Sequence, residues 1–299
     1  MKSINKISFI VSILFFSFLF SIKVYAQQDK FSFIVISDVH ISSDTIRDAK
    51  LKQFIGEVNN KIYGNACFIV FTGDNVSSYF ADRNKPNDVS NNRSLKFISI
   101  VSKLNIPYYI ALGNHDYKID RDKDSDAPFS QHEIDTMEIL WENSASLKPF
   151  YSFVYDGWKF IILNSMRGRY LNRFFDDVQM KMLKKELSDG KPAFLFFHHP
   201  IKTDHFRIWC KPKDLITEEK EPEFFSILRE YKNQVKGIFV GHGHMWNDDI
   251  LFNKVKVYET TTFGEKKPIA GYLIEANQNG EFFIKSFEKE DKQIHWESK

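Results

Sequence analysis

The stretch Phe31-Ser-Phe-Ile-Val-Ile-Ser-Asp-Val-His40 combines a short apolar run with an aspartate and a histidine that follow directly. A run so short and so rich in aromatic and β-branched residues predicts a buried strand. Asp38 and His40 then lie just past the carboxyl end of that strand. Open α/β sheets build their ligand sites at this edge.

The same arrangement occurs four more times along the chain. Apolar runs at 68–71, 108–112, 194–197 and 237–240 precede, in order, Gly73-Asp74, Gly113-Asn114-His115-Asp116, His198-His199-Pro200 and Gly241-His242-Gly243-His244. A single Asp or His after a strand is more often a cap or a loop hydrogen-bonding residue. Five donor clusters, each after a predicted strand, instead predict a metal site.

Predicted strands and helices alternate through the first half of the chain, which implies a largely parallel sheet. Helices are expected at about 44–63, 93–104, 131–141 and 177–187, and another begins at Glu221-Pro222. Asp156-Gly157 and Asn279-Gly280 predict hairpin turns in the later, strand-rich part. We therefore predict an α/β fold in one compact two-sheet domain.

The N-terminus has the outline of a secretory signal peptide. Lys2 and Lys6 precede an apolar run at 7–20, and Val24-Tyr-Ala26 places small residues where a signal peptidase cleaves. A membrane anchor is the alternative, but a span needs about 20 apolar residues. No cysteine follows the run, which disfavours a lipoprotein. We expect cleavage of residues 1–26, an exported (periplasmic or extracellular) domain at 27–299, and no stable membrane anchor afterwards.

Charge and cysteine content narrow the class of partner. Without residues 1–26, 38 basic residues face 39 acidic residues, a net charge of −1. This balance gives no reason to expect nucleic acid as a partner, and it disfavours a nuclease subunit. The two cysteines, Cys67 and Cys210, have no zinc-ligand spacing, and we interpret them as unpaired thiols. The oligomeric state is left open.

In their order, the clusters resemble the calcineurin-like metallophosphoesterase superfamily, whose pattern is DxH, GD, GNH followed by D or E, H, and GHxH. The resemblance covers about residues 31–263 and implies two stacked mixed β-sheets flanked by helices. It also implies two metal ions, with Asp38, His40, Asp74 and His244 around one and Asp74, Asn114, His198 and His242 around the other. His198 is preferred to His199 because the ligand usually stands two residues before the proline.

The chemistry of phosphate ester hydrolysis agrees with this set. Two divalent ions about 3.5–4 Å apart generate hydroxide at neutral pH and bind the phosphoryl oxygens. Two cations so close repel each other, so an anionic ligand must lie between them, and Asp74 is placed for this. Mixed imidazole and oxygen ligands suit Mn, Fe or Zn rather than Ca or Mg. By the resemblance, His115 protonates the leaving oxygen or stabilises charge on the phosphoryl group.

The chain departs from the pattern three residues after Asp74, where many members carry Asp or Tyr and this chain carries Ser77. The difference disfavours protein Ser/Thr phosphatases, in which that Asp orients the catalytic His, and purple acid phosphatases, in which the Tyr binds iron. What orients His115 is therefore open. Asp116 is adjacent but can point away, and Ser77 can offer only a neutral hydrogen bond.

Other residues are candidates without a motif. Arg167, Arg169 and His199 are candidates for the substrate site, because arginine suits phosphate, although exposed surface arginines are an equal alternative. Tyr117, the loop 75–92, and Phe206, Ile208 and Trp209 are candidates for shaping the pocket. The stretch from Asp122 imitates a calcium loop with Glu133 at its twelfth position. A capping box between Ser130 and Glu133 explains that glutamate better.

Together these observations predict an exported phosphoesterase with two metal ions that cleaves small-molecule phosphodiesters or nucleotide-type phosphates by attack of a metal-bound hydroxide. A phosphomonoesterase is the alternative within enzymes. A non-catalytic metal-binding or scaffold protein with the same fold is the alternative of another class.

Overall fold

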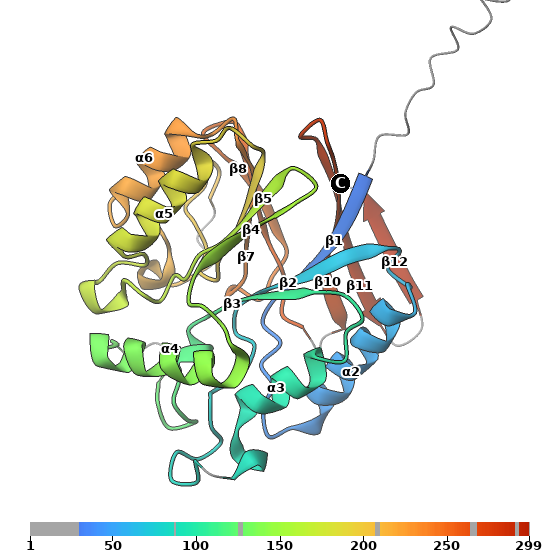
Figure 1. Ribbon diagram of the computed structural model, residues 1–299, viewed down its shortest axis with the longest axis vertical. Coiled ribbons are helices and arrows are strands. Elements are labelled where there is room, and N and C mark those ends of the chain that lie inside the picture. The colour runs from blue at the N-terminus through green and yellow to red at the C-terminus, as the bar shows by residue number, and fades with distance from the viewer. Residues whose placement is uncertain are drawn as a thin grey trace, which may run out of the picture.

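The computed structural model describes residues 30–86, 88–124, 128–206, 210–263, 268–290 and 293–298. In this part of the chain, two mixed β-sheets stack face to face and helices cover their outer faces (Figure 1). This is the predicted α/β fold. The predicted signal peptide lies outside the described residues. No helix in the described ranges combines the length and the apolar character needed to span a membrane.

The first sheet joins the N-terminal strands to the C-terminal ones. Its strands pair in the order β12 (Gln293–Ser298), β11 (Phe282–Glu290), β10 (Ile269–Asn277), β1 (Lys30–Ile36), β2 (Ala66–Thr72) and β3 (Tyr108–Ala111). The neighbours β1, β2 and β3 run parallel, as the alternating pattern predicted. Strands β10, β11 and β12 are antiparallel, and the turn at Asn279-Gly280 connects two of them.

The second sheet has the order β4 (Tyr151–Tyr155), β5 (Trp158–Ile162), β6 (Ala193–Phe196), β7 (Val235–Val240), β9 (Val255–Glu259) and β8 (Asn247–Leu251). Four of these strands, β5, β6, β7 and β9, are parallel, and β4 and β8 add antiparallel edges. The turn at Asp156-Gly157 closes the β4–β5 hairpin. The sequence analysis did not predict β8 or β12.

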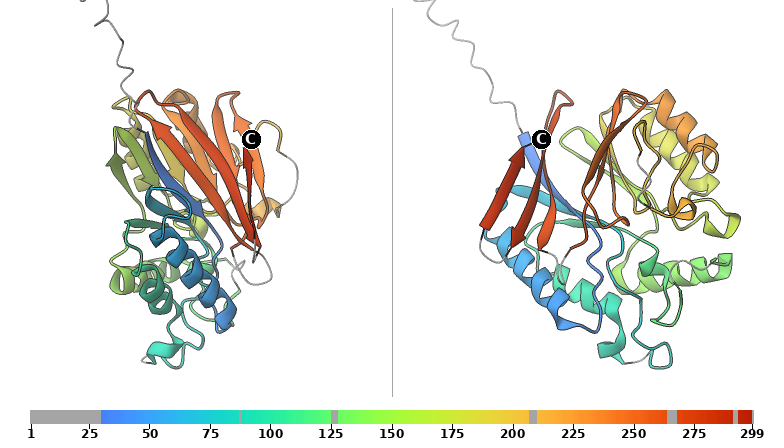
Figure 2. Two further views of the ribbon diagram at one scale, coloured as in Figure 1. Left: turned by 90° about the vertical axis from the view of Figure 1, so that its right-hand side faces the viewer. Right: turned by 180° about the vertical axis from the view of Figure 1, so that it is seen from behind.

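Five α-helices lie in the described residues: α2 (Thr45–Asn59), α3 (Arg93–Val101), α4 (Gln131–Ala145), α5 (Asp177–Leu187) and α6 (Pro222–Glu230). Short 3₁₀ turns lie at η1 (Val89–Asn91), η2 (His115–Tyr117), η3 (Arg169–Leu171) and η4 (Pro212–Asp214). Helices α2, α3 and α4 pack on the first sheet and α5 and α6 on the second (Figure 2). The capping box at the start of α4 is confirmed, with Ser130 bonded to the Glu133 backbone and the Glu133 carboxylate returning to Ser130.

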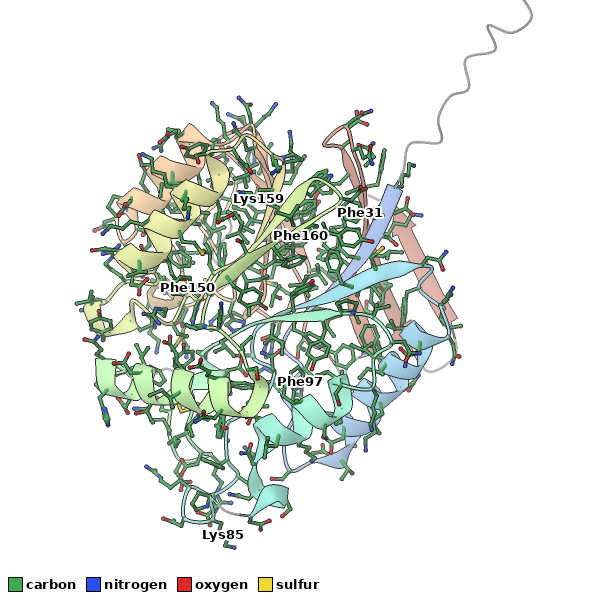
Figure 3. All side chains as sticks on the ribbon, viewed as in Figure 1. Phe31, Lys85, Phe97, Phe150, Lys159 and Phe160 are labelled. Carbon is green, nitrogen blue, oxygen red and sulfur yellow. The ribbon has the colours of Figure 1, made fainter. Side chains whose placement is uncertain are left out.

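An aromatic layer fills the space between the two sheets. Phe31 and Phe33 of β1 meet Phe160 of β5, with ring centroids 6.1 and 5.2 Å apart, and Phe68 of β2 lies 4.9 Å from Phe160. Phe31 and Phe160 lie in this layer, whereas Phe97 belongs to α3 and packs against Phe71 on the other face of the first sheet (Figure 3). Aromatic pairs in this offset or edge geometry add stability beyond the area that they bury. The layer fixes the two sheets to each other, and therefore fixes the loops at their shared edge.

The two cysteines are free, as predicted, and both are partly buried. Several other expectations fall partly outside the described residues. These are the middle of the calcium-like stretch at 125–127, and Ile208 and Trp209 of the proposed pocket loop.

Candidate metal centre

The five donor clusters meet at one edge of the stacked sheets. Strands β1, β2 and β3 end just before the clusters that contain Asp38, Asp74 and Asn114, and β6 and β7 end just before those of His198 and His242. Parallel strands bring their carboxyl ends to the same edge of a sheet. Because β1–β3 belong to one sheet and β6 and β7 to the other, both sheets supply donors to one place.

The backbone at this edge is strained. Asp38, His40, Asp74, His242 and His244 all have positive φ angles, between 51° and 75°. A residue other than glycine pays about 1–3 kcal/mol for such a conformation, and strain of this kind collects at functional sites. Main-chain hydrogen bonds hold the turns in place, from the Asp38 and His40 amides to the carbonyls of residues 73 and 74 at 3.0 and 2.8 Å.

The glycines of the motifs leave room for the donor side chains. A Cβ atom at Gly73 would lie 2.6 Å from His198 Nδ1. A Cβ atom at Gly113 would clash with the Asp74 carboxylate, and one at Gly241 would lie 2.5 Å from Asp38 Oδ2. Each of these three glycines therefore allows a donor from another loop to approach the backbone closely.

The first group of donors contains Asp38, His40, Asp74 and His244, whose ligand atoms all lie within 4.8 Å of one another. Asp38 Oδ1 lies 3.1 Å from His244 Nε2 and 3.6 Å from His40 Nε2. His40 Nε2 in turn lies 3.6 Å from Asp74 Oδ2. The His244 side chain is 44% exposed, so solvent reaches the group from that side.

The second group contains Asp74, Asn114, His198 and His242. Asn114 Oδ1 lies 3.1 Å from His198 Nε2 and 3.1 Å from His242 Nδ1, and Asp74 Oδ2 lies 3.3 Å from His198 Nε2. The same oxygen of Asp74 therefore faces His40 of the first group and His198 of the second. The structure brings together all seven residues that the sequence analysis chose as metal ligands.

Residues 31–246 match the family model described as calcineurin-like phosphoesterase. The chain belongs to this family. Its members depend on two metal ions, and membership makes the chain a metal-dependent phosphoric ester hydrolase. The non-catalytic alternative gains no support. None of the curated proteins matches the chain.

Solved structures resemble the fold at low sequence identity. A dimetal phosphatase from Danio rerio has a TM-score of 0.56 and 12% identity, over 85% of this chain and 98% of that one. An NAD nucleotidase from Haemophilus influenzae and a 5'-nucleotidase precursor from Thermus thermophilus have TM-scores of 0.49 and 0.48 and identities of 13% and 12%. The matches cover 91% and 86% of this chain, respectively. In each case they cover 54% of the other chain. The first match supports the shared fold, and we draw nothing from the other two.

The electrostatics of the donor groups fit the pair of cations on which the family depends. Asp38 is fully buried, and its Oδ1 makes no hydrogen bond of standard geometry. Burial would raise the pKa of Asp38, but His244 and His40 hold it well below its usual range. Burial would lower the pKa of His198, but Asp74 raises it to about 9. A buried carboxylate oxygen without a hydrogen bond, among imidazole nitrogens, is a site that a transition-metal ion would satisfy.

The structure shows which groups orient His115. Its backbone amide donates to Asp74 Oδ1 at 2.8 Å, and its ring Nδ1 lies 3.0 Å from the main-chain carbonyl oxygen of Ser77. Its ring meets that of His40 edge to face, with centroids 4.7 Å apart. Asp116 points away and accepts hydrogen bonds from the amides of Gly113 and Val76. His115 is therefore held beside the donor groups by the main-chain carbonyl of Ser77 and the carboxylate of Asp74.

The arginines predicted for substrate binding have other partners. Arg167 forms ion pairs with Glu138 and Asp176 and lies over the ring of Phe150, away from the pocket lining. Because two carboxylates engage its guanidinium, Arg167 is not included in the proposed site. Arg169 lies 3.4 Å from Asp214 and donates to the Lys213 carbonyl. It also does not line the pocket.

His199 is buried beside His198 and His242 of the second group. Its Nδ1 lies 2.8 Å from Ser165 Oγ, whereas His198 faces Asp74 and Asn114. Burial and the neighbouring imidazoles of His242 and His198 hold its pKa well below the usual range. His199 is thus neutral and packs against the ring of His242, with ring centroids 4.9 Å apart. Tyr117, a candidate for shaping the pocket, is also buried and donates to Glu138.

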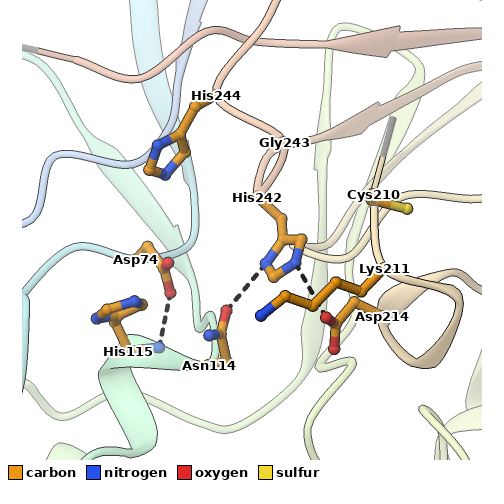
Figure 4. A pocket seen from close by; sticks show the side chains of 9 residues that line it. All are labelled: Asp74, Asn114, His115, Cys210, Lys211, Asp214, His242, Gly243 and His244. Atoms are coloured by element: carbon orange, nitrogen blue, oxygen red, sulfur yellow. Dashed lines mark hydrogen bonds and ion pairs between the residues drawn. The ribbon is translucent and has the colours of Figure 1, made fainter. Parts of the chain in front are cut away.

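The pocket over the donors has a volume of about 270 Å³, and the sequence analysis missed part of its wall. Cys210, Lys211 and Asp214 line it together with Asn114, His115 and His242 (Figure 4). Asp214 Oδ2 lies 3.8 Å from His242 Nε2. His199, Asp214 and His242 also form a possible metal-ligand group. Because the Arg169 cation already lies beside Asp214, we interpret Asp214 as a partner of His242 rather than as a ligand of a third ion.

Proposed function

We propose that this chain is an exported phosphoesterase that uses two metal ions to cleave phosphodiesters or nucleotide-type phosphates of small molecules. The observation that supports it best is the position of Asp74. One oxygen of its buried carboxylate lies 3.6 Å from His40 and 3.3 Å from His198. An anion shared by two donor groups is what two neighbouring cations require.

The proposed ligands are Asp38, His40, Asp74 and His244 for one ion and Asp74, Asn114, His198 and His242 for the other. When bound, the ions supply a deprotonated water at neutral pH and neutralise charge on the phosphoryl oxygens. Mn, Fe or Zn suits this imidazole and oxygen set.

His115 is the proposed catalytic residue. The Ser77 carbonyl accepts a hydrogen bond from Nδ1–H, and this tautomer leaves the ring Nε2 for proton transfer to and from substrate. As the phosphorus–oxygen bond breaks, the imidazolium form of His115 would give its Nε2 proton to the leaving oxygen and return to the neutral Nδ1–H tautomer. The hydrogen bond from the His115 backbone amide to the Asp74 carboxylate keeps the ring beside the donor groups.

The size and charge of the protein support a small substrate. The pocket of about 270 Å³ lies just below the range of about 300–1,000 Å³ that is usual for ligand sites. The near-neutral charge of residues 27–299 supports a small phosphate ester over nucleic acid. A phosphomonoesterase is the second candidate, and Lys211 in the pocket wall favours it because a monoester carries the larger charge.

A metal analysis with a two-substrate assay tests the proposal. The protein is loaded with Mn²⁺, its metal content is measured, and hydrolysis of bis(p-nitrophenyl) phosphate is compared with that of p-nitrophenyl phosphate. We expect two ions per chain and faster cleavage of the diester. Asp74→Asn should lose metal and activity together, whereas the exposed His132→Ala should change neither. One ion or none at saturation contradicts the paired site, and a strong preference for the monoester reverses the order of the two candidates.

Export is a separate part of the proposal, supported by Lys2, Lys6 and the apolar run at 7–20. Mass spectrometry of the protein from a cell that expresses the full chain should find an N-terminus at residue 27. Recovery of the intact N-terminus in the membrane fraction would instead support an anchor.

A further inference from the structure

Lys211 is the cationic side chain in the lining of the pocket that the structure describes. It lies in the segment between β6 and α6, directly before η4. In Figure 4 its ammonium group points into the pocket, toward Asn114 and the ring of His242. His115 lines the pocket on the other side of Asn114 (Figure 4). A phosphoryl group over the donors therefore has His115 on one side and Lys211 on the other.

The backbone that carries Lys211 is held by two cations from outside the pocket. Arg169 donates to the Lys213 carbonyl at 3.0 Å and lies 3.4 Å from Asp214, and Lys220 donates to the Pro212 carbonyl at 2.6 Å. Both cations lie over the ring of Phe174, at 4.9 and 5.5 Å from its centre.

A further bond closes the turn itself, from the Asp214 amide to the Lys211 carbonyl at 2.9 Å. Arg169 and Lys220 thus hold the backbone of residues 211–214, and among these four described residues Lys211 is the lysine that lines the pocket.

We propose that Lys211 binds a non-bridging oxygen of the substrate phosphoryl group and sets the preference between doubly charged monoesters and singly charged diesters. This inference rests on the proposed function. Lysine is a compact cation that donates charge-assisted hydrogen bonds to phosphate. Its attraction grows with the charge of its partner, so it adds more to the binding of a monoester dianion than to that of a diester monoanion. The whole pocket determines which of the two esters has the higher kcat/KM. Lys211 affects the ratio of the two kcat/KM values.

Three variants of the full, Mn²⁺-loaded chain test the inference. Lys211→Met removes the charge, Lys211→Arg retains it, and Lys213→Met removes a neighbouring exposed lysine that does not line the pocket. The measured quantity is kcat/KM for p-nitrophenyl phosphate divided by kcat/KM for bis(p-nitrophenyl) phosphate. We expect Lys211→Met to lower this ratio about fivefold to tenfold, chiefly through a higher KM for the monoester. Lys211→Arg and Lys213→Met should leave it within about twofold.

The outcomes separate the inference from the proposed function. A ratio that Lys211→Met leaves unchanged, or that Lys213→Met lowers as much, overturns the role of Lys211 while the enzyme still hydrolyses esters. If the wild type hydrolyses neither ester, the proposed function fails. Calorimetry with inorganic phosphate then tests whether Lys211 binds a phosphate group. A phosphate Kd at least about fivefold weaker in Lys211→Met supports the cation. An equal Kd, or no binding of phosphate by the wild type, overturns it.

Discussion

The imidazole Nδ1 of His115 lies 3.0 Å from the main-chain carbonyl oxygen of Ser77. A main-chain carbonyl accepts a hydrogen bond whatever side chain the residue carries. The orientation of His115 therefore does not need an acidic side chain at position 77. The Ser77 hydroxyl is used elsewhere and donates to the Ile41 carbonyl at 3.2 Å.

This relationship predicts different results for two neighbouring substitutions. His115→Ala should lower kcat for phosphate esters by about 10² to 10³, because it removes the proton donor for the leaving oxygen. Ser77→Ala should keep kcat within about twofold, because it retains the carbonyl. Steady-state kinetics on preparations of equal metal content would check both. A wild-type rate in His115→Ala would remove this residue from the mechanism.

A second prediction concerns the glycine of the third motif. In Gly113→Ala the added Cβ would clash with the carboxylate and the backbone amide of Asp74. Because this part of the core is closely packed, we expect a loss of about 1–3 kcal/mol in the free energy of unfolding and weaker metal binding. Denaturant unfolding and a metal titration would measure the two effects.

The control for this glycine is Gly56→Ala in α2, where nothing lies within 4 Å of the added Cβ. There the free energy of unfolding should stay the same or rise by up to about 1 kcal/mol. Equal losses in the two variants would show that the clash with Asp74 is not the cause.

The strands and the donors that follow them could be predicted from the sequence, because both depend on local patterns. The run from Phe33 to Ile36 is apolar on both faces, since one face meets the aromatic layer and the other meets the helices. The donors Asp38 and Asp74 come directly after such runs. Their convergence then follows from the rule that parallel strands end at one edge. Strand β8 was missed because its sequence, Asn247-Asp-Asp-Ile-Leu251, starts with three polar residues.

The rest of the pocket depends on contacts between distant segments. Asp214 and Lys211 lie in a stretch without periodicity. Their segment is held by Arg169, which contacts Lys213 and Asp214 of η4 and lies over the ring of Phe174. Arg167 pairs with Glu138, which is 29 residues earlier on α4, and nothing local in the sequence indicates that pair. Charge in a loop marked Arg167 and Arg169 as candidates and could have marked Lys211 as well, but it could not show which of the three faces the pocket.

A third prediction concerns the partner of His242. The Asp214 carboxylate lies 3.8 Å from His242 Nε2, while His242 Nδ1 faces Asn114 in the second donor group. A carboxylate beyond a ligand imidazole fixes its tautomer, and loss of such a partner weakens metal affinity about 10- to 100-fold. We expect this loss in Asp214→Asn, measured by metal titration in the absence of substrate.

Glu218→Gln is the matched control for Asp214→Asn. This glutamate lies in the same connecting segment and pairs with Arg229 on the surface. Its substitution should leave metal affinity within about twofold of the wild type. Equal affinity of all three proteins would show that Asp214 does not act on His242.

The last prediction uses the buried carboxyl group of Glu259 at the end of β9. Both of its oxygens are buried, and neither makes a hydrogen bond of standard geometry. Burial, together with the negative charge of Asp38, raises the pKa of Glu259 to about 10. A group whose pKa is raised by folding stabilises the fold fully at low pH, and this contribution is lost as pH rises from the unfolded value toward 10.

Glu259→Gln should therefore gain stability relative to the wild type as pH rises. In metal-free protein, the difference in Tm between variant and wild type should be larger at pH 8 than at pH 5 by several degrees, because each pH unit between the two pKa values changes the stability by about 1.4 kcal/mol. Glu142→Gln, at an exposed position on α4, should show the same small difference at both pH values. Thermal unfolding in EDTA at the two pH values would check this. A constant difference for Glu259→Gln would mean that the carboxyl group has the same affinity for protons in the folded and unfolded chains.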